Sequence, residues 1–188
     1  MNWTPDTPPL EGITYTDHLP LAWEQISDMP GDGELNRINR DNEDLLQALL
    51  ILAEPLSEHE EEDEGPGSEN LMRVEAKLNL MLGLLGEILL ANYLLPDTWA
   101  VQVGTRGFSV HDKKGSDLSN DSLLKIKLYL DPKFPRPLLL YGRVQDVHDD
   151  GFALKYLPLE ARLQDLLDKY VFRQHRRAVA LSRRRENP

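Results

Sequence analysis

The 188-residue sequence contains no cysteine, which excludes a disulfide framework, a zinc site built on thiolates and a cysteine nucleophile. It also lacks the basic and apolar regions of a signal peptide at its N-terminus. Its most apolar stretch, 78–95, is interrupted by asparagines, glycines and a glutamate. A run broken in this way is typical of a buried helix rather than a membrane span. We therefore expect a cytoplasmic protein without a membrane span.

Signatures of catalysis and of metal binding are absent as well. We find no nucleophile motif, no glycine-rich phosphate loop and no oxyanion signature. The five histidines show neither of the common zinc-ligand spacings, and we interpret those that follow strands as turn residues. We predict a protein that is not an enzyme and that has no metal site and no cofactor. The histidines are His18, His59, His111, His148 and His175.

Charge is unevenly distributed along a chain whose formal net charge is −11. Residues 54–69 hold eight acids and no lysine or arginine, and residues 172–185 hold six arginines and no acid. We interpret the acidic run as a solvated loop and the basic run as a helix end whose arginines complement the helix dipole. An acidic chain with one short basic segment is a poor candidate for nucleic-acid binding, so we expect no nucleic-acid partner.

Four zones of different pattern divide the chain, which is long enough for one domain with an added element. Residues 1–30 are rich in proline and contain one predicted strand, Gly12–Thr16. Residues 31–95 form a helical region with an acidic break at 57–68. Residues 97–157 alternate apolar and polar side chains and end in a helix over 158–185.

Both helical segments of the second zone carry apolar residues at alternating steps of three and four, which is the heptad pattern of coiled coils. In the first segment the stripe is Leu35, Ile38, Asn42, Leu45, Leu49 and Leu52. In the second it is Leu71, Val74, Leu78, Met81, Leu85, Ile88 and Asn92. We propose that both stripes serve oligomerisation.

An intramolecular hairpin packed on the rest of the chain would explain the same stripes. A second apolar row beside the first, including Leu80 and Leu84, favours self-association, because a helix with two apolar faces needs more than one neighbour. If the asparagines take a positions, Val74 and Ile88 take d positions, and β-branched residues at d with leucine at a favour four strands. We therefore predict a homotetramer.

Short strands without intervening helices indicate an antiparallel meander or a small barrel in the third zone. The final helix carries a leucine-rich face that can cover one end of such a barrel. The fold class is thus α+β, with long helices added to a small barrel. The predicted strands are Trp99–Val103, Gly107–His111, Leu124–Leu130, Leu138–Val147 and Phe152–Tyr156.

The order of three segments in this zone resembles an atypical PilZ domain with an added heptad-repeat helical region. They are Val103–Val110, Leu138–Val144 and Asp149–Leu154, followed by Leu163 and Tyr170 in the last helix. The resemblance implies a six-stranded antiparallel barrel with a C-terminal helix. It also implies a place in cyclic-di-GMP signalling and in pathways such as motility and virulence.

PilZ domains bind cyclic di-GMP through an Arg-x-x-x-Arg segment and an Asp/Asn-x-Ser-x-x-Gly strand. Aligned on Gly107, the second motif places Gln102 and Gly104 at the acidic and serine positions, so that only the glycine is retained. The first motif is missing, and Arg106 is the one cation beside the strand. Because clustered arginines are needed to offset the desolvation of two phosphates, we expect weak or absent binding.

The resemblance therefore implies a signalling adaptor that acts through contacts with an unidentified protein. The alternative is a genuine receptor for cyclic di-GMP that uses displaced arginines, such as Arg37 and Arg40.

Overall fold

The computed structural model describes residues 12–52, 94–111, 118–131, 134, 136–148 and 151–186. It also describes positions 73–74, 76–78, 80–81, 83–85 and 88, all of which are helical. Among these residues no helix combines the length and apolar character that crossing a membrane requires.

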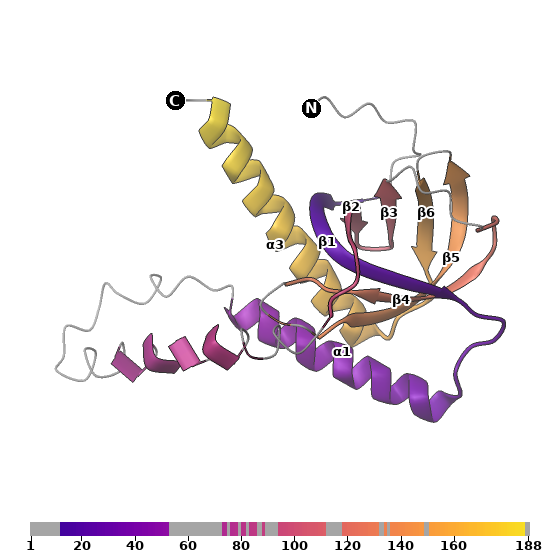
Figure 1. The fold of residues 1–188 in the computed structure, drawn as a ribbon, viewed down its shortest axis with the longest axis horizontal. Helices are drawn as coiled ribbons and strands as arrows, with labels where there is room; N and C mark the ends of the chain where they lie inside the picture. Colours follow the sequence, from indigo (N-terminus) through magenta and orange to yellow (C-terminus); the bar gives the residue numbers. More distant parts are fainter. Residues whose placement is uncertain are drawn as a thin grey trace.

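Six antiparallel strands form a closed barrel in the order β1-β2-β3-β6-β5-β4 (Figure 1). This confirms the predicted barrel and its C-terminal helix. Closure gives every strand two neighbours in the sheet. The strands are β1 (Thr14–Gln25), β2 (Thr98–Gly104), β3 (Gly107–His111), β4 (Leu123–Leu128), β5 (Leu138–His148) and β6 (Gly151–Tyr156).

β1 closes the barrel because it pairs with two different strands. Residues 14–20 pair with β2, and residues 21–25 pair with β4. Pro20 lies where the pairing changes, and its carbonyl accepts a hydrogen bond from the backbone N–H of Tyr129 at 3.0 Å. The observed strand extends well past the predicted Gly12–Thr16. It continues through Pro20, although a proline inside an apolar run usually argues against a continuous strand.

Alternate side chains of every strand fill the barrel, as the period-two pattern requires. Phe108 on β3 and Phe152 on the neighbouring strand β6 pack edge to face inside the barrel, with ring centroids 6.1 Å apart. Further residues that are almost completely buried in this core include Leu21, Val101, Val103, Leu124, Ile126, Leu138, Leu140, Val144 and Leu154.

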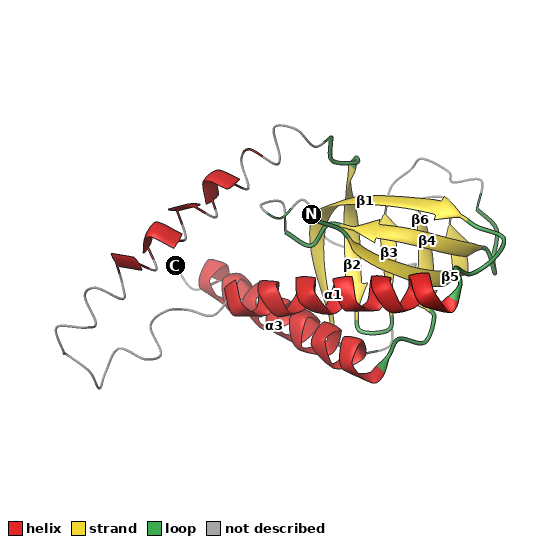
Figure 2. Cartoon of the chain, turned by 90° about the horizontal axis from the view of Figure 1, so that it is seen from below, coloured by secondary structure: helices red, strands yellow, loops and turns green. Residues whose placement is uncertain are grey.

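Two helices, α1 (Asp32–Leu52) and α3 (Ala161–Glu186), lie side by side below the barrel (Figure 2). The buried face of α3 includes Leu163, Leu167 and Val171. Its Arg173 donates a hydrogen bond from Nη1 to the carbonyl of Leu50 at 2.5 Å. Because α1 has no basic residue in its own last turn, this guanidinium supplies the cation that a helix C-terminus favours.

Asn42 fixes α1 to β5 through the backbone of Leu139. Its Nδ2 donates to the Leu139 carbonyl at 2.6 Å, and its Oδ1 accepts from the Leu139 N–H at 2.9 Å. Pairing of β5 with β6 begins only at Gly142, so this stretch of β5 has a strand on one side alone. The amide of Asn42 therefore takes the place of the missing strand partner.

The heptad stripe of α1 is used within the chain, which corrects its assignment to an intersubunit surface. Ile38, Asn42, Leu45 and Leu49 are buried against the barrel and α3 without any second copy. Leu35 is half-buried, and Leu52, at the end of the helix, is exposed. The intramolecular alternative therefore describes the first segment.

Replacing Asn42 by alanine should lower the free energy of unfolding by about 1–3 kcal/mol, because the N–H and C=O of Leu139 would lose their partners. Urea denaturation followed by circular dichroism measures the change. Asn36, exposed on the same helix, provides the control, and Asn36→Ala should leave stability nearly unchanged. Equal stability of the two variants would contradict the structural role of Asn42.

Candidate functional site

The turn between β2 and β3 brings together the four residues that align with the cyclic-di-GMP motif. Gln102 and Gly104 lie on β2, Arg106 lies in the turn, and Gly107 begins β3. Gln102 is opposite Ser109 in the strand pairing. The four residues thus lie in one compact region. The chemistry of this region depends on what each side chain contacts.

The polar side chains of this region are already bonded within the chain. Gln102 Nε2 donates to Thr14 Oγ1 at 3.1 Å. Arg106 Nη1 donates to Gln164 Oε1 at 3.0 Å, and Gln164 Nε2 donates to the carbonyl of Thr105 at 2.9 Å. Because Gln164 is on α3, the helix holds the turn through the backbone carbonyl of Thr105 and the side chain of Arg106. An anion would have to compete with Gln164 for the guanidinium.

Gly107, the motif residue that is retained, is required by the packing of the barrel. A Cβ added at this position would lie 2.1 Å from the carbonyl oxygen of Leu154 on β6. Because that atom belongs to the backbone of a paired strand, the two strands would have to separate. The glycine is therefore explained by the fold and does not indicate a ligand.

The buried tyrosines of β6 and α3 offer no acid–base chemistry near neutral pH. The backbone N–H of Tyr156 donates to the carbonyl of Arg106 at 2.8 Å. Burial raises the pKa of Tyr156 above its ordinary value, and burial raises the pKa of Tyr170 to about 12. Both hydroxyls stay protonated at physiological pH and belong to the core.

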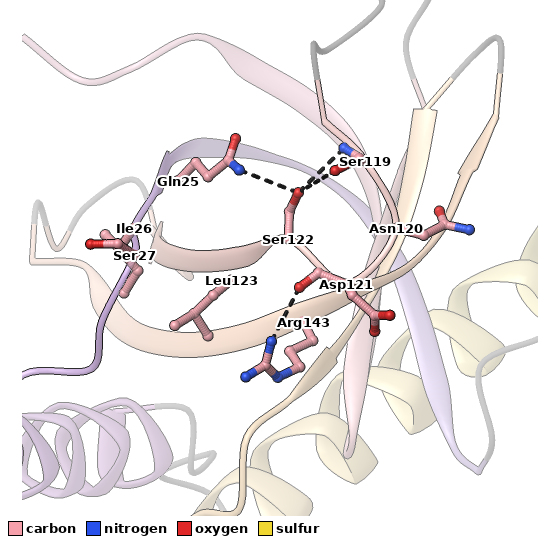
Figure 3. Close-up of a pocket in the computed structure, with 9 residues that line it drawn as sticks. All are labelled: Gln25, Ile26, Ser27, Ser119, Asn120, Asp121, Ser122, Leu123 and Arg143. Atoms are coloured by element: carbon pink, nitrogen blue, oxygen red, sulfur yellow. Dashed lines mark hydrogen bonds between the residues drawn. The ribbon is translucent and has the colours of Figure 1, made fainter.

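A polar hollow of about 330 Å³ lies at the other end of the barrel, where β1 ends and β4 begins (Figure 3). Its wall is a turn, in which the N–H of Ser122 donates to the carbonyl of Ser119 at 3.1 Å and Asp121 has a φ of 65°. The lining residues are Gln25, Ile26, Ser27, Ser119, Asn120, Asp121, Ser122, Leu123 and Arg143.

The polar groups of this hollow bond mainly to one another. Ser122 Oγ accepts from Gln25 Nε2 at 3.5 Å and lies 3.1 Å from Ser119 Oγ, and Arg143 Nη1 donates to the carbonyl of Asp121 at 3.2 Å. Arg143 and Asp121 contribute one positive and one negative charge, so the wall of the hollow has no net charge and does not favour binding of a phosphate. Sequence reasoning did not single out this turn, although its run of serine, asparagine and aspartate is a turn signal.

An exposed apolar helix is the second candidate for function. The seven large apolar side chains described between residues 74 and 88 are each at least half exposed, with 50–64% of their surface accessible. Five of them belong to the predicted heptad stripe: Val74, Leu78, Met81, Leu85 and Ile88. The other two, Leu80 and Leu84, belong to the second row. Leu71 and Asn92 of the same stripe lie outside the described residues.

No group of three or more histidine or acidic side chains is close enough to hold a metal ion in the part of the chain that the structure describes. His148 Nε2 lies 3.5 Å from Asp146 Oδ2, and His111 Nε2 lies 3.2 Å from Ser109 Oγ. Each of these pairs is made by residues of one strand.

Comparison with known proteins agrees with this geometry. A family model described as an atypical PilZ domain, cyclic di-GMP receptor, matches residues 46–184. A solved structure from Xanthomonas campestris, described as a pathogenic protein with a tetrameric PilZ domain self-assembled via an unusual helical bundle, is 25% identical with a TM-score of 0.71. The match covers 90% of this chain and 92% of that one.

A Legionella protein described as uncharacterized is also similar, with 16% identity and a TM-score of 0.27, over 47% of this chain and 82% of that one. No curated protein matches the sequence.

Replacing Gly107 by alanine should destabilise the barrel by about 1–3 kcal/mol or more, because the new methyl group would displace the β6 backbone. Thermal unfolding measures the loss. Gly33 in the first turn of α1, where an added Cβ meets nothing within 4 Å, is the matched control. Gly33→Ala should be neutral or stabilising, as alanine is the better helix former. A tolerated Gly107→Ala would show that packing does not explain this glycine.

Proposed function

This chain belongs to the atypical PilZ domain family, and from that membership we propose that it is a self-assembling, non-enzymatic adaptor of cytoplasmic cyclic-di-GMP signalling. It acts by presenting several copies of its barrel to a partner protein. The observation that carries this proposal is the exposed apolar surface of the helical residues described between 73 and 88, because such a surface is stable in water only when another surface covers it.

We expect a bundle of four copies of the second heptad segment, rather than two, to cover this exposed apolar surface. With α1 packed on its own barrel, each chain contributes a single helix to the bundle. The leucines Leu78 and Leu85 take a positions, and Val74 and Ile88 take d positions, a combination that favours four strands. The tetrameric helical bundle described for the Xanthomonas campestris protein supports this arrangement.

Weak or absent binding of cyclic di-GMP follows from the charges around the β2–β3 turn. Arg106 is the one arginine in the turn, and Gln164 already accepts its hydrogen bond. Two phosphates leave water at a large cost unless several guanidiniums replace their hydration. A single engaged arginine does not supply that replacement, so the residues Gln102, Gly104, Arg106 and Gly107 form a degenerate site.

A genuine receptor remains the alternative, with the ligand bound by displaced arginines. Arg37 and Arg40 are exposed in the N-terminal half of α1, where Asp41 pairs with Arg136 at 2.9 Å. These arginines lie on a different element from the β2–β3 turn. Binding there would make the assembly a sensor rather than an adaptor.

Light scattering should give the mass of four chains for the unmodified protein and a lower mass for Leu78→Glu combined with Leu85→Glu. The substitutions place carboxylates in the apolar interior of the bundle, at a cost of several kcal/mol. Ala76→Glu with Gly83→Glu is the matched control, since these exposed positions have the same spacing on the outer face of the helix. A monomeric protein, or an unchanged mass in the leucine variant, would contradict the bundle.

Isothermal titration with cyclic di-GMP should show no binding at micromolar ligand, because clustered arginines are missing from the β2–β3 turn. Binding of micromolar strength or tighter would overturn the adaptor proposal. In that event Arg37→Gln with Arg40→Gln should abolish the heat if the displaced site is used. The control is Arg143→Gln, which removes an exposed arginine from the polar hollow at the other end of the barrel.

A further inference from the structure

The outer part of α3 extends beyond the barrel (Figure 1). Up to Val171 the helix has a buried face, whereas every side chain described from Phe172 to Arg183 is half-buried or exposed. Near the base of this extension, Arg173 donates a hydrogen bond to the carbonyl of Leu50 in α1. The extension is therefore anchored at its base, and its later turns carry side chains that the solvent reaches.

Positive charge dominates this extension, and arginine supplies it. Residues 172–185 hold six arginines, no lysine and no acid. Arg176, Arg177 and Arg183 are exposed and form no ion pair within the described part of the chain. Arg173 and Arg177 are four residues apart, a spacing at which like charges destabilise an exposed helix. A negatively charged surface that covers these turns therefore stabilises them.

The four arginines described in the extension lie in two neighbouring rows along one side of α3. Arg173 and Arg177 are four residues apart, and Arg176 and Arg183 are seven apart, so each pair follows one line of the helix. His175 precedes Arg177 by two residues, or about 200° of rotation, and its Nδ1 lies 2.6 Å from a backbone carbonyl oxygen of β1. The row of Arg173 and Arg177 is thus on the side of the helix opposite this contact with the barrel.

An aromatic side chain borders the arginine rows. Phe172 is 48% exposed, and the guanidinium carbon of Arg176 lies 5.9 Å from the centroid of its ring. Arginine and aromatic residues are enriched in the cores of protein–protein interfaces, whereas lysine is depleted there. Arginine also binds a carboxylate through two parallel N–H groups, which lysine does not do. We call Phe172, Arg173, Arg176, Arg177 and Arg183 together the basic face.

We propose that the basic face binds an acidic segment of the partner protein, with carboxylates that pair with the arginines and an apolar side chain that covers Phe172. This inference rests on the adaptor function proposed above and assigns the surface through which the adaptor recognises its partner. Charge complementarity supports it, because Arg176, Arg177 and Arg183 have no ion pair within the described part of the chain. From Arg173 to Arg183 the helix rises about 15 Å, which matches about three turns of an acidic helix.

Two other negatively charged partners fit this surface less well. A membrane surface requires a continuous apolar face, but the exposed Phe172 and Leu181 are nine residues apart and therefore lie on opposite sides of the helix. Nucleic acid is a polyanion that the formal net charge of −11 repels at long range, and one short basic segment neutralises few of its phosphates. A protein segment offers both carboxylates for the arginines and an apolar side chain for Phe172.

The number of contacts supplies the strength of the interaction. One exposed ion pair contributes little by itself, so the arginines must act together with the apolar contact at Phe172. An assembly of several chains presents several basic faces at once. A partner with more than one acidic segment then binds the assembly more tightly than it binds a single chain.

Fluorescence anisotropy with a labelled synthetic peptide tests the basic face. The probe is a helix-stabilised peptide of about four turns, with glutamates at steps of three and four residues and one leucine beside them. In the control peptide, glutamine replaces every glutamate. We expect the acidic peptide to bind the unmodified protein at micromolar concentration and the control peptide not to bind.

Arg176→Gln combined with Arg177→Gln and Arg183→Gln should weaken binding about tenfold or more, because charge-assisted hydrogen bonds to the carboxylates are lost. The matched control replaces Lys127, Arg143 and Lys155 by glutamine, which removes three exposed cations from the barrel strands and changes the net charge equally. This control variant should bind the peptide like the unmodified protein. Circular dichroism confirms that the helices persist in each variant.

Phe172→Gln should also weaken binding, because the leucine of the peptide loses its apolar contact. An acidic peptide that does not bind, or that binds equally to the arginine variant and the unmodified protein, would overturn the inference. Tighter binding to a short DNA duplex or to vesicles of phosphatidylserine and phosphatidylcholine would also overturn it, because the basic face would then recognise nucleic acid or a membrane. Peptide binding that ignores Phe172→Gln would argue against a protein surface as the natural partner.

Light scattering on the same samples separates this inference from the proposed assembly. The four-chain mass without peptide binding would overturn the basic face and leave the bundle standing. A monomer that binds the peptide would overturn the bundle alone. Binding of the peptide should persist in Leu78→Glu combined with Leu85→Glu, since these substitutions lie outside α3.

Discussion

The apolar face of α3 is buried under the barrel, and several separate features rely on that contact. Leu163, Leu167 and Val171 are almost completely buried there, and burial of each such side chain stabilises the fold by about 1.5–3 kcal/mol. Once α3 is fixed, Gln164 reaches the β2–β3 turn and Arg173 reaches the last turn of α1. The same helix then carries its basic residues out beyond the barrel.

The two helical segments with heptad patterns have different neighbours for a physical reason. The barrel leaves one stretch of β5 without a strand on one side, and α1 covers it with Asn42 in place of that strand. One helix satisfies this need, and the apolar side chains that the structure describes in the second segment are exposed. The intramolecular packing of one helix and the proposed assembly of the other are thus complementary.

The residues that align with the cyclic-di-GMP motif are engaged in contacts within the chain. Arg106 pairs with a side chain of α3, Gln102 pairs with Thr14, and Gly107 is held by the approach of β6. Polar groups that are satisfied within the chain gain little from a ligand. We infer that the barrel contributes shape and attachment to the assembly rather than recognition of the messenger.

The sequence by itself determined the barrel, its C-terminal helix and the family, because strand alternation and turn residues are local signals. It also located the region of Gln102 to Gly107. Only the tertiary structure decided that the stripe containing Asn42 packs on β5, since an apolar stripe does not specify which surface covers it. The length of β1 likewise depended on a partner exchange at Pro20. The role of Gly107 required the position of Leu154, about fifty residues away along the chain, which local patterns do not encode.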